Sequence, residues 1–278
     1  MKSTEELLKE LNEEQIKPVL ATEGAVLVLA GAGSGKTRVL TTRIAYLMRE
    51  KGVSPRSILA ITFTNKAANE MKERVSLLGD TEGMWVCTIH SMCVRILRDF
   101  AESAGLNKNF SIYSETERNN VLKKAYKETL ESDEREDELF KQIKRAISDA
   151  KTQGVTPEEY AAANKGDRDI KEITRVFTAY EKHLAENNAL DFDDLLSRTL
   201  RLLRSDKEAR EYLGGKFRYI MVDEFQDTNE VQFEIVRLLS LVHGNLFAVG
   251  DDDQSIYGWR GARIENILQF EKQFPSAQ

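Results

Sequence analysis

The chain has 278 residues, of which 41% are hydrophobic and 31% are charged, and its net charge is −6. This composition supplies enough apolar surface for one large domain or two smaller ones. The acidic balance gives no sign of a nucleic-acid binder with a basic overall charge, although a local basic groove can occur on an acidic protein. The sequence has no signal-peptide pattern and no apolar run of membrane-spanning length, so we expect a cytoplasmic protein.

Cysteine and histidine are scarce. The spacing of Cys87 and Cys93 fits neither a zinc site nor a disulfide framework, so we interpret them as reduced core thiols, which agrees with a cytoplasmic location. The chain has only three histidines, His90, His183 and His243, which argues against a histidine-based metal site.

The first part of the chain alternates between two kinds of hydrophobic pattern. Residues 1–15 are typical of one capped, charged helix. Short apolar runs then predict buried strands, and segments of helical period lie between them. The predicted strands are 26–30, 58–63 and 84–89, and the predicted helices begin at Thr37 and span 66–77. This alternation indicates an α/β domain with a mainly parallel sheet.

The middle of the chain, from about Ser114 to Leu184, is charged and helical in period, with almost no strand-like run. Its acidic stretch 131–138 is interpreted as a solvated loop or helix start, and Pro157 suits the first turn of a new helix. Strand patterns return at 217–222 and 246–249. We therefore expect an all-helical insertion, 111–188, within one α/β domain formed by 1–110 and 189–278.

The segment AGAGSGKT, Ala30–Thr37, fits the phosphate-loop pattern except that Ala30 stands where the strict form has glycine. Its glycines allow backbone N–H groups to turn inward around phosphates, and the following helix adds the positive end of its dipole. Lys36 would reach the β- and γ-phosphates, and the Thr37 hydroxyl would bind Mg²⁺. The alternative, a glycine-rich linker, is disfavoured by the buried strand before the segment and the amphipathic helix after it.

Acidic residues end a later predicted strand in YIMVDEFQDTNEVQ, 219–232. Because parallel strands end at one edge of a sheet, we expect Asp223 and Glu224 beside the phosphate loop. Asp223 would then hold the metal, through water, and Glu224 would orient and deprotonate the attacking water. Carboxylates also favour ordinary helix N-termini, so this segment alone would leave both interpretations open.

Six segments in a fixed order resemble the N-terminal half of superfamily 1A DNA helicases of the UvrD/Rep/PcrA type. They are AGAGSGKT, ITFTNKAANEM, TIHSMCVRILR, DFDDLL, VDEFQDTNEVQ and VGDDDQSIYGWRGA. The resemblance implies a RecA-like P-loop NTPase domain, called 1A, interrupted by a helical domain, called 1B. It covers nearly the whole chain outside the helical insertion.

The resemblance also implies which residues contact the nucleotide. LNEEQ, 11–15, is similar to the family's adenine-reading element, so Gln15 would hydrogen-bond adenine. Gln254 would contact the γ-phosphate and sense its loss, as a catalytic residue beside Lys36 and Glu224. The loop residues implied to surround the phosphates are Ala32, Gly33, Ser34, Gly35, Lys36, Thr37 and Arg38. The implied substrate is ATP, with Mg²⁺ as cofactor.

DNA contacts follow from the same resemblance. Aromatic rings can stack on bases of any sequence, and Tyr257 and Trp259 lie only three and five residues after Gln254. One segment would thus couple hydrolysis to the grip on DNA, with Arg260 helping to connect the two. The implied DNA contacts are Phe63, His90, Phe192, Tyr257, Trp259 and Arg260. Ordinary packing is the alternative for these aromatics, and it applies most to Phe63, which ends an apolar strand.

Two departures from the family limit the expected activity. Phe225 stands where the family often has tyrosine, and the sequence stops before the family's second RecA-like domain, 2A, and its 2B insertion. Those domains supply the arginines that stabilise charge during phosphoryl transfer. We therefore expect a fragment of a 3′-to-5′ helicase that cannot unwind DNA alone, whose partners are single-stranded DNA, junctions with duplex and the missing 2A and 2B domains. The alternatives are a nucleotide- and DNA-binding module without turnover and a small-molecule phosphotransferase, which would ignore DNA.

Overall fold

The computed structural model describes residues 3–31, 33–130, 136–166, 168–251 and 270–278, and the chain forms two compact units. The first unit comprises Met1–Met92 and Lys207–Gln278, and the second comprises Cys93–Asp206. The expected insertion, 111–188, falls inside the second unit. The second unit extends beyond 111–188 at both ends, because it also includes part of the preceding helix and the whole of the following helix.

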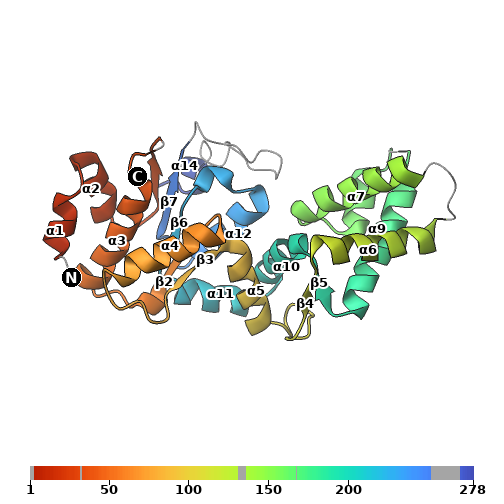
Figure 1. The fold of residues 1–278 in the computed structure, drawn as a ribbon, viewed down its shortest axis with the longest axis horizontal. Helices are drawn as coiled ribbons and strands as arrows, with labels where there is room; N and C mark the ends of the chain where they lie inside the picture. Colours follow the sequence, from red (N-terminus) through yellow and green to blue (C-terminus); the bar gives the residue numbers. More distant parts are fainter. Residues whose placement is uncertain (1–2, 32, 131–135, 167, 252–269) are drawn as a thin grey trace. The chain divides into compact units, whose positions relative to one another are not determined.

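A five-stranded parallel sheet forms the centre of the first unit, in the order β1-β7-β6-β2-β3 (Figure 1). Its strands are β1 (Val26–Leu29), β2 (Ile58–Thr62), β3 (Trp85–Thr88), β6 (Tyr219–Val222) and β7 (Leu246–Gly250). All residues of β2, β6 and β7 are buried, as expected for strands covered on both faces. The predicted fold class, an α/β domain with a parallel sheet, is confirmed.

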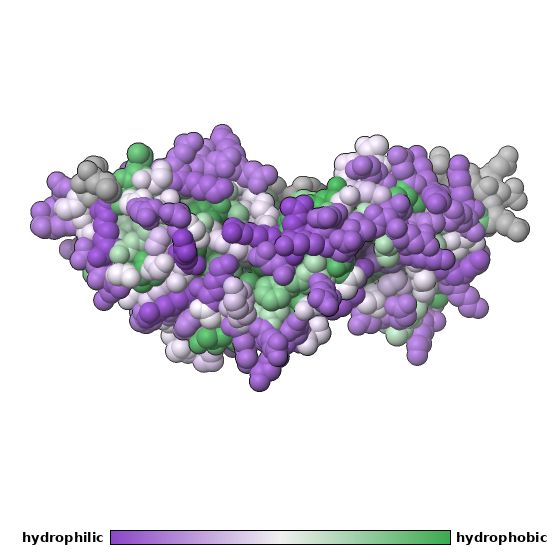
Figure 2. Space-filling model, turned by 90° about the horizontal axis from the view of Figure 1, so that it is seen from below, coloured by the Kyte–Doolittle hydropathy of each residue, from purple (hydrophilic) through white to green (hydrophobic). Residues whose placement is uncertain are grey.

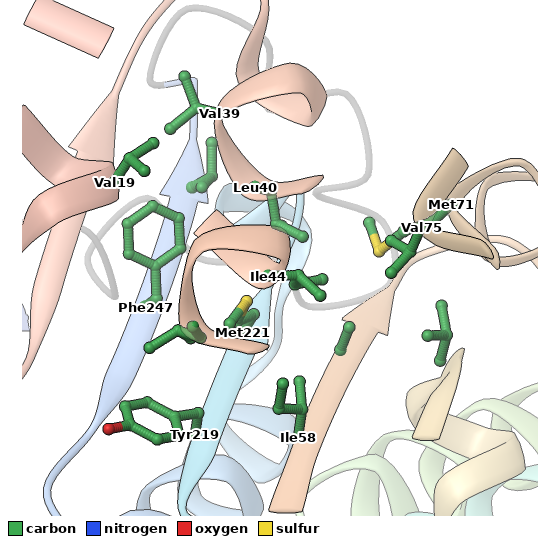
Figure 3. Close-up of a cluster of buried hydrophobic side chains, with 14 of the residues drawn as sticks. Val19, Val39, Leu40, Ile44, Ile58, Met71, Val75, Tyr219, Met221 and Phe247 are labelled. Carbon is green, nitrogen blue, oxygen red and sulfur yellow. The ribbon is translucent and has the colours of Figure 1, made fainter. Parts of the chain in front are cut away.

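Helices surround this sheet. They are α1 (Thr4–Lys9), α2 (Glu13–Leu20), α3 (Lys36–Glu50), α4 (Asn65–Ser76), α5 (Ile89–Asp99, which continues into the second unit), α11 (Lys207–Lys216), α12 (Glu230–Ser240) and α14 (Phe270–Gln273), with short 3₁₀ turns η1 (Pro55–Ser57) and η2 (Phe225–Asp227). On one face, Leu40 and Ile44 of α3 pack over Met221 of β6 and Phe247 of β7 (Figure 3). The core of this unit therefore holds α3, and with it the start of that helix, firmly against the central strands.

Alternate residues of the same strands turn to the opposite face. Side chains in a strand alternate between faces, so Ile220 and Val222 point away from the cluster that contains Met221. They are buried, and α12 packs against β6 without contributing to that cluster. The central strands are therefore sandwiched between helical layers, which fixes the position of the residues at their carboxyl ends.

The second unit is built from helices α6 (Glu115–Thr129), α7 (Glu136–Thr152), α8 (Pro157–Ala163), α9 (Ile170–Glu186) and α10 (Phe192–Ser205). Its core joins α6, α7 and α9 through Leu122, Ile147 and Phe177. Two short parallel strands, β4 (Ser111–Ile112) and β5 (Ala189–Leu190), also pair here. The expected all-helical insertion, 111–188, missed β4, because two-residue strands leave no periodic pattern, and β5 lies directly after this insertion.

The N-terminal segment forms two helices rather than the single helix expected for residues 1–15. Helix α1 ends at Lys9, and Asn12 then caps α2. The Asn12 side chain accepts a hydrogen bond from the backbone of Gln15, and the Gln15 side chain accepts one from the backbone of Asn12. This reciprocal capping starts a new helix at Glu13 and places Gln15 in its first turn.

On the face seen in Figure 2, most of the surface is hydrophilic and hydrophobic residues gather in small patches. Within the described ranges, no helix combines the length and the apolar character needed to cross a bilayer.

Candidate active site

Three segments with chemically active residues follow neighbouring strands at one edge of the sheet. The phosphate loop follows β1, Asp251 follows β7, and Asp223 and Glu224 follow β6, and these strands are adjacent in the order β1-β7-β6. Because the strands are parallel, their carboxyl ends meet at the same edge. The sheet thus brings together residues more than 200 positions apart in the chain.

The phosphate loop turns through two glycines with left-handed backbone angles. Gly33 has φ 73° and Gly35 has φ 88°, a region that side chains other than glycine rarely adopt. Helix α3 begins directly afterwards at Lys36, with Gly35 at its N-cap. Thr37 is half-buried, whereas Ser34 and Arg38 are exposed. Ala32 lies outside the described residues.

The Lys36 ammonium group is held inside the loop. Its Nζ donates to the carbonyl oxygen of Ala30 at 2.8 Å and to Oδ2 of Asp251 at 3.1 Å. The side chains of Lys36 and Asp251 are only 9% and 1% exposed. Sequence reasoning gave Asp251 no role, although an acid that directly follows a buried strand beside β1 was a usable signal.

Asp223 and Glu224 place two carboxylates side by side at the end of β6. Burial, with a further contribution from the negative charge of Glu224, raises the pKa of Asp223 to about 6. The backbone N–H of Glu224 donates to Oδ1 of Asp223 at 3.1 Å. Glu224 itself has φ 50°, which costs about 1–3 kcal/mol for a residue with a side chain and is typical of functional sites.

Gln226, in η2, links Glu224 to Asp251. It is 1% exposed, and its Nε2 donates to Oε2 of Glu224 at 2.7 Å. Its Oε1 accepts from the backbone N–H of Asp251 at 2.9 Å. A hydrogen-bonded chain therefore runs from Glu224 through Gln226 and Asp251 to Lys36. Sequence reasoning missed Gln226, because its importance depends on the contact between the segments that follow β6 and β7.

The residues at this edge suit a magnesium ion that is bound mainly by phosphates and water. Among the residues that the structure describes, no group of three or more His, Cys, Asp or Glu side chains could hold a metal. Mg²⁺ commonly binds one or two protein oxygens plus substrate phosphates. Thr37 and Asp223 can supply such oxygens, and a cation would relieve the repulsion between the Asp223 and Glu224 carboxylates.

A cavity of about 530 Å³ lies beside the phosphate loop. Its lining includes Gln15, Pro18, Ser34, Lys36 and Val39. The cavity therefore combines a polar end at the loop with apolar surface from α2, β1 and α3. Such a volume and lining are typical of small-molecule sites.

Gln15 connects this cavity to the loop. Its Nε2 donates to the carbonyl oxygen of Ser34 at 2.7 Å, and its Oε1 accepts from the backbone N–H of Asn12 at 3.0 Å. An amide nitrogen carries two hydrogens and an amide oxygen has two lone pairs, so each atom retains capacity for a second bond. The remaining donor and acceptor match the N7 and N6–H₂ groups of adenine.

The residues expected to contact DNA are only partly described. Phe63 directly follows β2 and His90 lies in the first turn of α5, after β3, and both are half-buried. They therefore share the sheet edge that carries the phosphate loop. Phe192, the first residue of α10, belongs to the second unit and is 51% exposed. Gln254, Tyr257, Trp259 and Arg260 lie outside the described residues.

A phosphate loop before α3 and acidic residues after the parallel strands β7 and β6 define a RecA-like nucleotide-binding domain. Residues 11–275 match the model of the UvrD/REP helicase N-terminal domain. The chain therefore belongs to the UvrD/Rep helicase family, as the six ordered segments predicted.

Curated relatives support the same assignment. The chain is 51% identical over 274 residues to the ATP-dependent DNA helicase PcrA of Staphylococcus aureus strain Mu50 and to that of strain NCTC 8325. It is 50% identical over 275 residues to the ATP-dependent DNA helicase PcrA of Staphylococcus epidermidis strain ATCC 12228. These matches cover 98% of this chain but 37% of each relative. The chain thus spans little more than a third of the length of these relatives.

Proposed function

We propose that this chain is the ATP-binding part of a DNA helicase that couples ATP hydrolysis to 3′-to-5′ movement along single-stranded DNA. The observation that carries the proposal is the meeting of Lys36 with the Asp223–Glu224 pair at one sheet edge, linked through Gln226 and Asp251. Membership of the UvrD/Rep family supports DNA as the partner, and the similarity to ATP-dependent DNA helicases supports ATP as the substrate.

In the proposed reaction, Lys36 contacts the β- and γ-phosphates and neutralises part of their charge. The Glu224 carboxylate accepts a proton from the water that attacks the γ-phosphate, and its hydrogen bond to Gln226 orients it for this role. Thr37 and Asp223 would hold Mg²⁺, which supplies positive charge to the phosphates when bound. Gln254, which lies outside the described residues, is the proposed γ-phosphate sensor.

Binding of the base is assigned to Gln15. Gln15 lines a cavity of about 530 Å³ that reaches the phosphate loop, and its amide group retains one donor and one acceptor for a ligand. Because the same Nε2 also bonds Ser34, adenine and the loop would be held by one side chain. The loop residues from Ala32 to Arg38 complete the proposed nucleotide site.

Single-stranded DNA, including its junctions with duplex DNA, is the proposed partner along which the helicase moves. Phe63 and His90 lie at the sheet edge of the nucleotide site, and Phe192, Tyr257, Trp259 and Arg260 are proposed as further contacts. Stacking on aromatic rings tolerates any base sequence, as a translocating protein requires. Unwinding and the direction of movement are proposed for the whole helicase, which would also contain domains 2A and 2B.

The test is ATP turnover by this chain, with and without a single-stranded oligonucleotide, in the wild type and in Glu224→Gln. We expect turnover that rises with DNA and falls by roughly 10²–10⁴-fold in the variant, which loses the proton acceptor. Nucleotide affinity should persist in the variant, because the amide is nearly the same size.

Other outcomes separate the alternatives. Binding of nucleotide and DNA without turnover by the wild type would favour a binding module that depends on further domains for catalysis. Turnover that is insensitive to DNA would contradict the proposed coupling of ATP hydrolysis to DNA.

A further inference from the structure

Gln226 is buried in the candidate active site, and both ends of its amide group are hydrogen-bonded. Its Nε2 donates to Glu224 Oε2 at 2.7 Å, and its Oε1 accepts from the Asp251 backbone at 2.9 Å. Because the side chain is only 1% exposed, water cannot easily replace either bond. The position of the Glu224 carboxylate is therefore tied to the first residue after β7.

Asp251 is in turn tied to the phosphate loop through its carboxylate. Lys36 Nζ lies 3.1 Å from Asp251 Oδ2, and both side chains are almost fully buried. Phosphate groups that enter the loop compete with this carboxylate for the same ammonium group, because both are anions. Weakening a buried ion pair is costly, so we expect the Asp251 carboxylate to shift when phosphates draw Lys36 away from it.

We propose that Gln226 is a positioning residue that links phosphate binding to the position of the Glu224 carboxylate. When Lys36 moves from Asp251 to a phosphate group, Gln226 transmits the resulting shift of Asp251 to Glu224. The inference rests on the proposed function of this site. Phosphate entry changes the environment of Asp251, the Asp251 backbone shifts against Gln226 Oε1, and Gln226 Nε2 moves the carboxylate. The Glu224 carboxylate thus moves to the position needed for catalysis when phosphates occupy the loop.

The left-handed backbone of Glu224, with φ 50° and ψ 48°, supports this coupling. A residue held in this region depends on surrounding contacts to stay there. The bond from Gln226 is one of those contacts, so a change at Gln226 acts on a segment that is already strained.

The first test is the nuclear magnetic resonance signal of the Gln226 side-chain amide in the full chain, identified by its loss in Gln226→Glu. The probes are the magnesium complex of a non-hydrolysable ATP analogue and inorganic pyrophosphate. The matched control is the side-chain amide of Gln232, which is also buried and whose Oε1 accepts from the backbone N–H of Asn229 at 3.1 Å.

We expect both probes to move the Gln226 signal and to leave that of Gln232 in place. The Asp251→Asn variant without nucleotide should move the Gln226 signal in the same direction, since it also breaks the ion pair with Lys36. A Gln226 signal that stays unchanged while nucleotide saturates the wild type would overturn the coupling alone. Absence of any nucleotide binding would overturn the proposed function of the site, and the coupling with it.

The second test separates binding from turnover. Gln226→Met lacks both hydrogen bonds at similar size and places no second carboxyl group beside Glu224. We expect this variant to bind ATP within about twofold of the wild type and to turn over roughly 10–100-fold more slowly, as for a misplaced catalytic group. Equal losses of affinity and turnover, with an unchanged circular dichroism spectrum, would indicate a merely structural role and contradict the proposal.

Discussion

The guanidinium carbon of Arg43 lies 4.4 Å from the centroid of the Phe247 ring, between helix α3 and strand β7. The side chain is 1% exposed and donates to the carbonyl oxygens of Pro18 at 2.5 Å and Ala21 at 2.6 Å. These carbonyls end α2, where no intrahelical donor is available. One buried cation of the phosphate-loop helix therefore fixes the helix that carries Gln15.

Replacing Arg43 with methionine should lower the free energy of unfolding of the first unit by roughly 3 kcal/mol, because buried carbonyls lose their donors. Urea unfolding measures the loss, and hydrogen exchange should increase in α2. Arg38→Met, an exposed change on the same helix, is the control for stability. Unchanged protection of α2 in the Arg43 variant would contradict the role of this side chain.

Gln15 should determine the preference for adenine. In Gln15→Ala, the advantage of ATP over GTP should shrink by roughly 5–150-fold, because a bidentate amide–adenine pair contributes about 1–3 kcal/mol of discrimination. Competition binding with the two nucleotides measures this ratio. Glu13→Ala, an exposed change in the same turn, should leave the ratio unaltered. A variant that weakens both nucleotides equally would show that Gln15 supports the loop without reading the base.

Phe63 is predicted to contribute to DNA affinity. Phe63→Ala should weaken binding of a single-stranded oligonucleotide by roughly 5–150-fold, the effect of about 1–3 kcal/mol for one stacked base. Fluorescence anisotropy of a labelled oligonucleotide measures the affinity. Tyr212→Ala removes another aromatic ring, 63% exposed on α11, and should leave the affinity unaltered. Lower stability with unchanged DNA affinity would assign Phe63 to packing alone.

The buried charges of the second unit predict a pH dependence. Lys151 Nζ lies 2.7 Å from Glu181 Oε1, 2.8 Å from Asp191 Oδ2 and 2.8 Å from Asp194 Oδ1, so three carboxylates share one ammonium group. Burial, which Lys151 offsets only in part, raises the pKa of Asp194 from 3.8 to about 7. The folded chain then retains a proton that the unfolded chain releases. The free energy of unfolding should therefore fall as pH rises from about 4 to about 7, by at most ~1.4 kcal/mol per pH unit.

Hydrogen exchange of α7 and α10, corrected for the intrinsic effect of pH, measures this slope. Asp194→Asn should flatten it, because the amide does not titrate in this range. Asp149→Asn, an exposed change on α7, should retain the slope of the wild type. The same slope in both variants would exclude Asp194 as its source.

Asn188 is the second described residue other than glycine with a left-handed backbone, at φ 45°. It follows α9, and its Oδ1 accepts from the backbone N–H of Asn107 at 3.3 Å. Asn188→Ala should destabilise the second unit by about 1–2 kcal/mol, because alanine disfavours this backbone region. Asn188→Gly loses the same hydrogen bond but tolerates the backbone, so urea unfolding should give it a smaller loss. Equal losses would indicate that the hydrogen bond, not the backbone, determines stability.

The parts of the fold that could be predicted from the sequence are those that neighbouring residues encode. Five strands appeared as short apolar runs, and the structure places them within two residues of their predicted ends. The phosphate loop was evident because its glycines, Lys36 and Thr37 are consecutive. Likewise, Asp223 and Glu224 were predicted from the rule that parallel strands end at one edge.

The network behind this site could not be predicted in the same way. Gln226 meets Asp251 because β6 and β7 pair, and Asp251 meets Lys36 because β7 also pairs with β1. Neither contact leaves a local pattern. Arg43 was equally hidden, since a single arginine in an amphipathic helix ordinarily faces solvent, and only the packing of α2 shows why it is buried.

The pairing of β4 with β5 has a consequence for how this family can change. Ser111 lies opposite Ala189, so the chain enters and leaves the helices α6 to α9 through adjacent strands. The entropic cost of closing a loop grows only slowly with its length. Helices between these strands can therefore be lengthened, shortened or exchanged in the course of evolution while the point of attachment is preserved. The two residues of each strand thus hold the start and the end of this helical segment together.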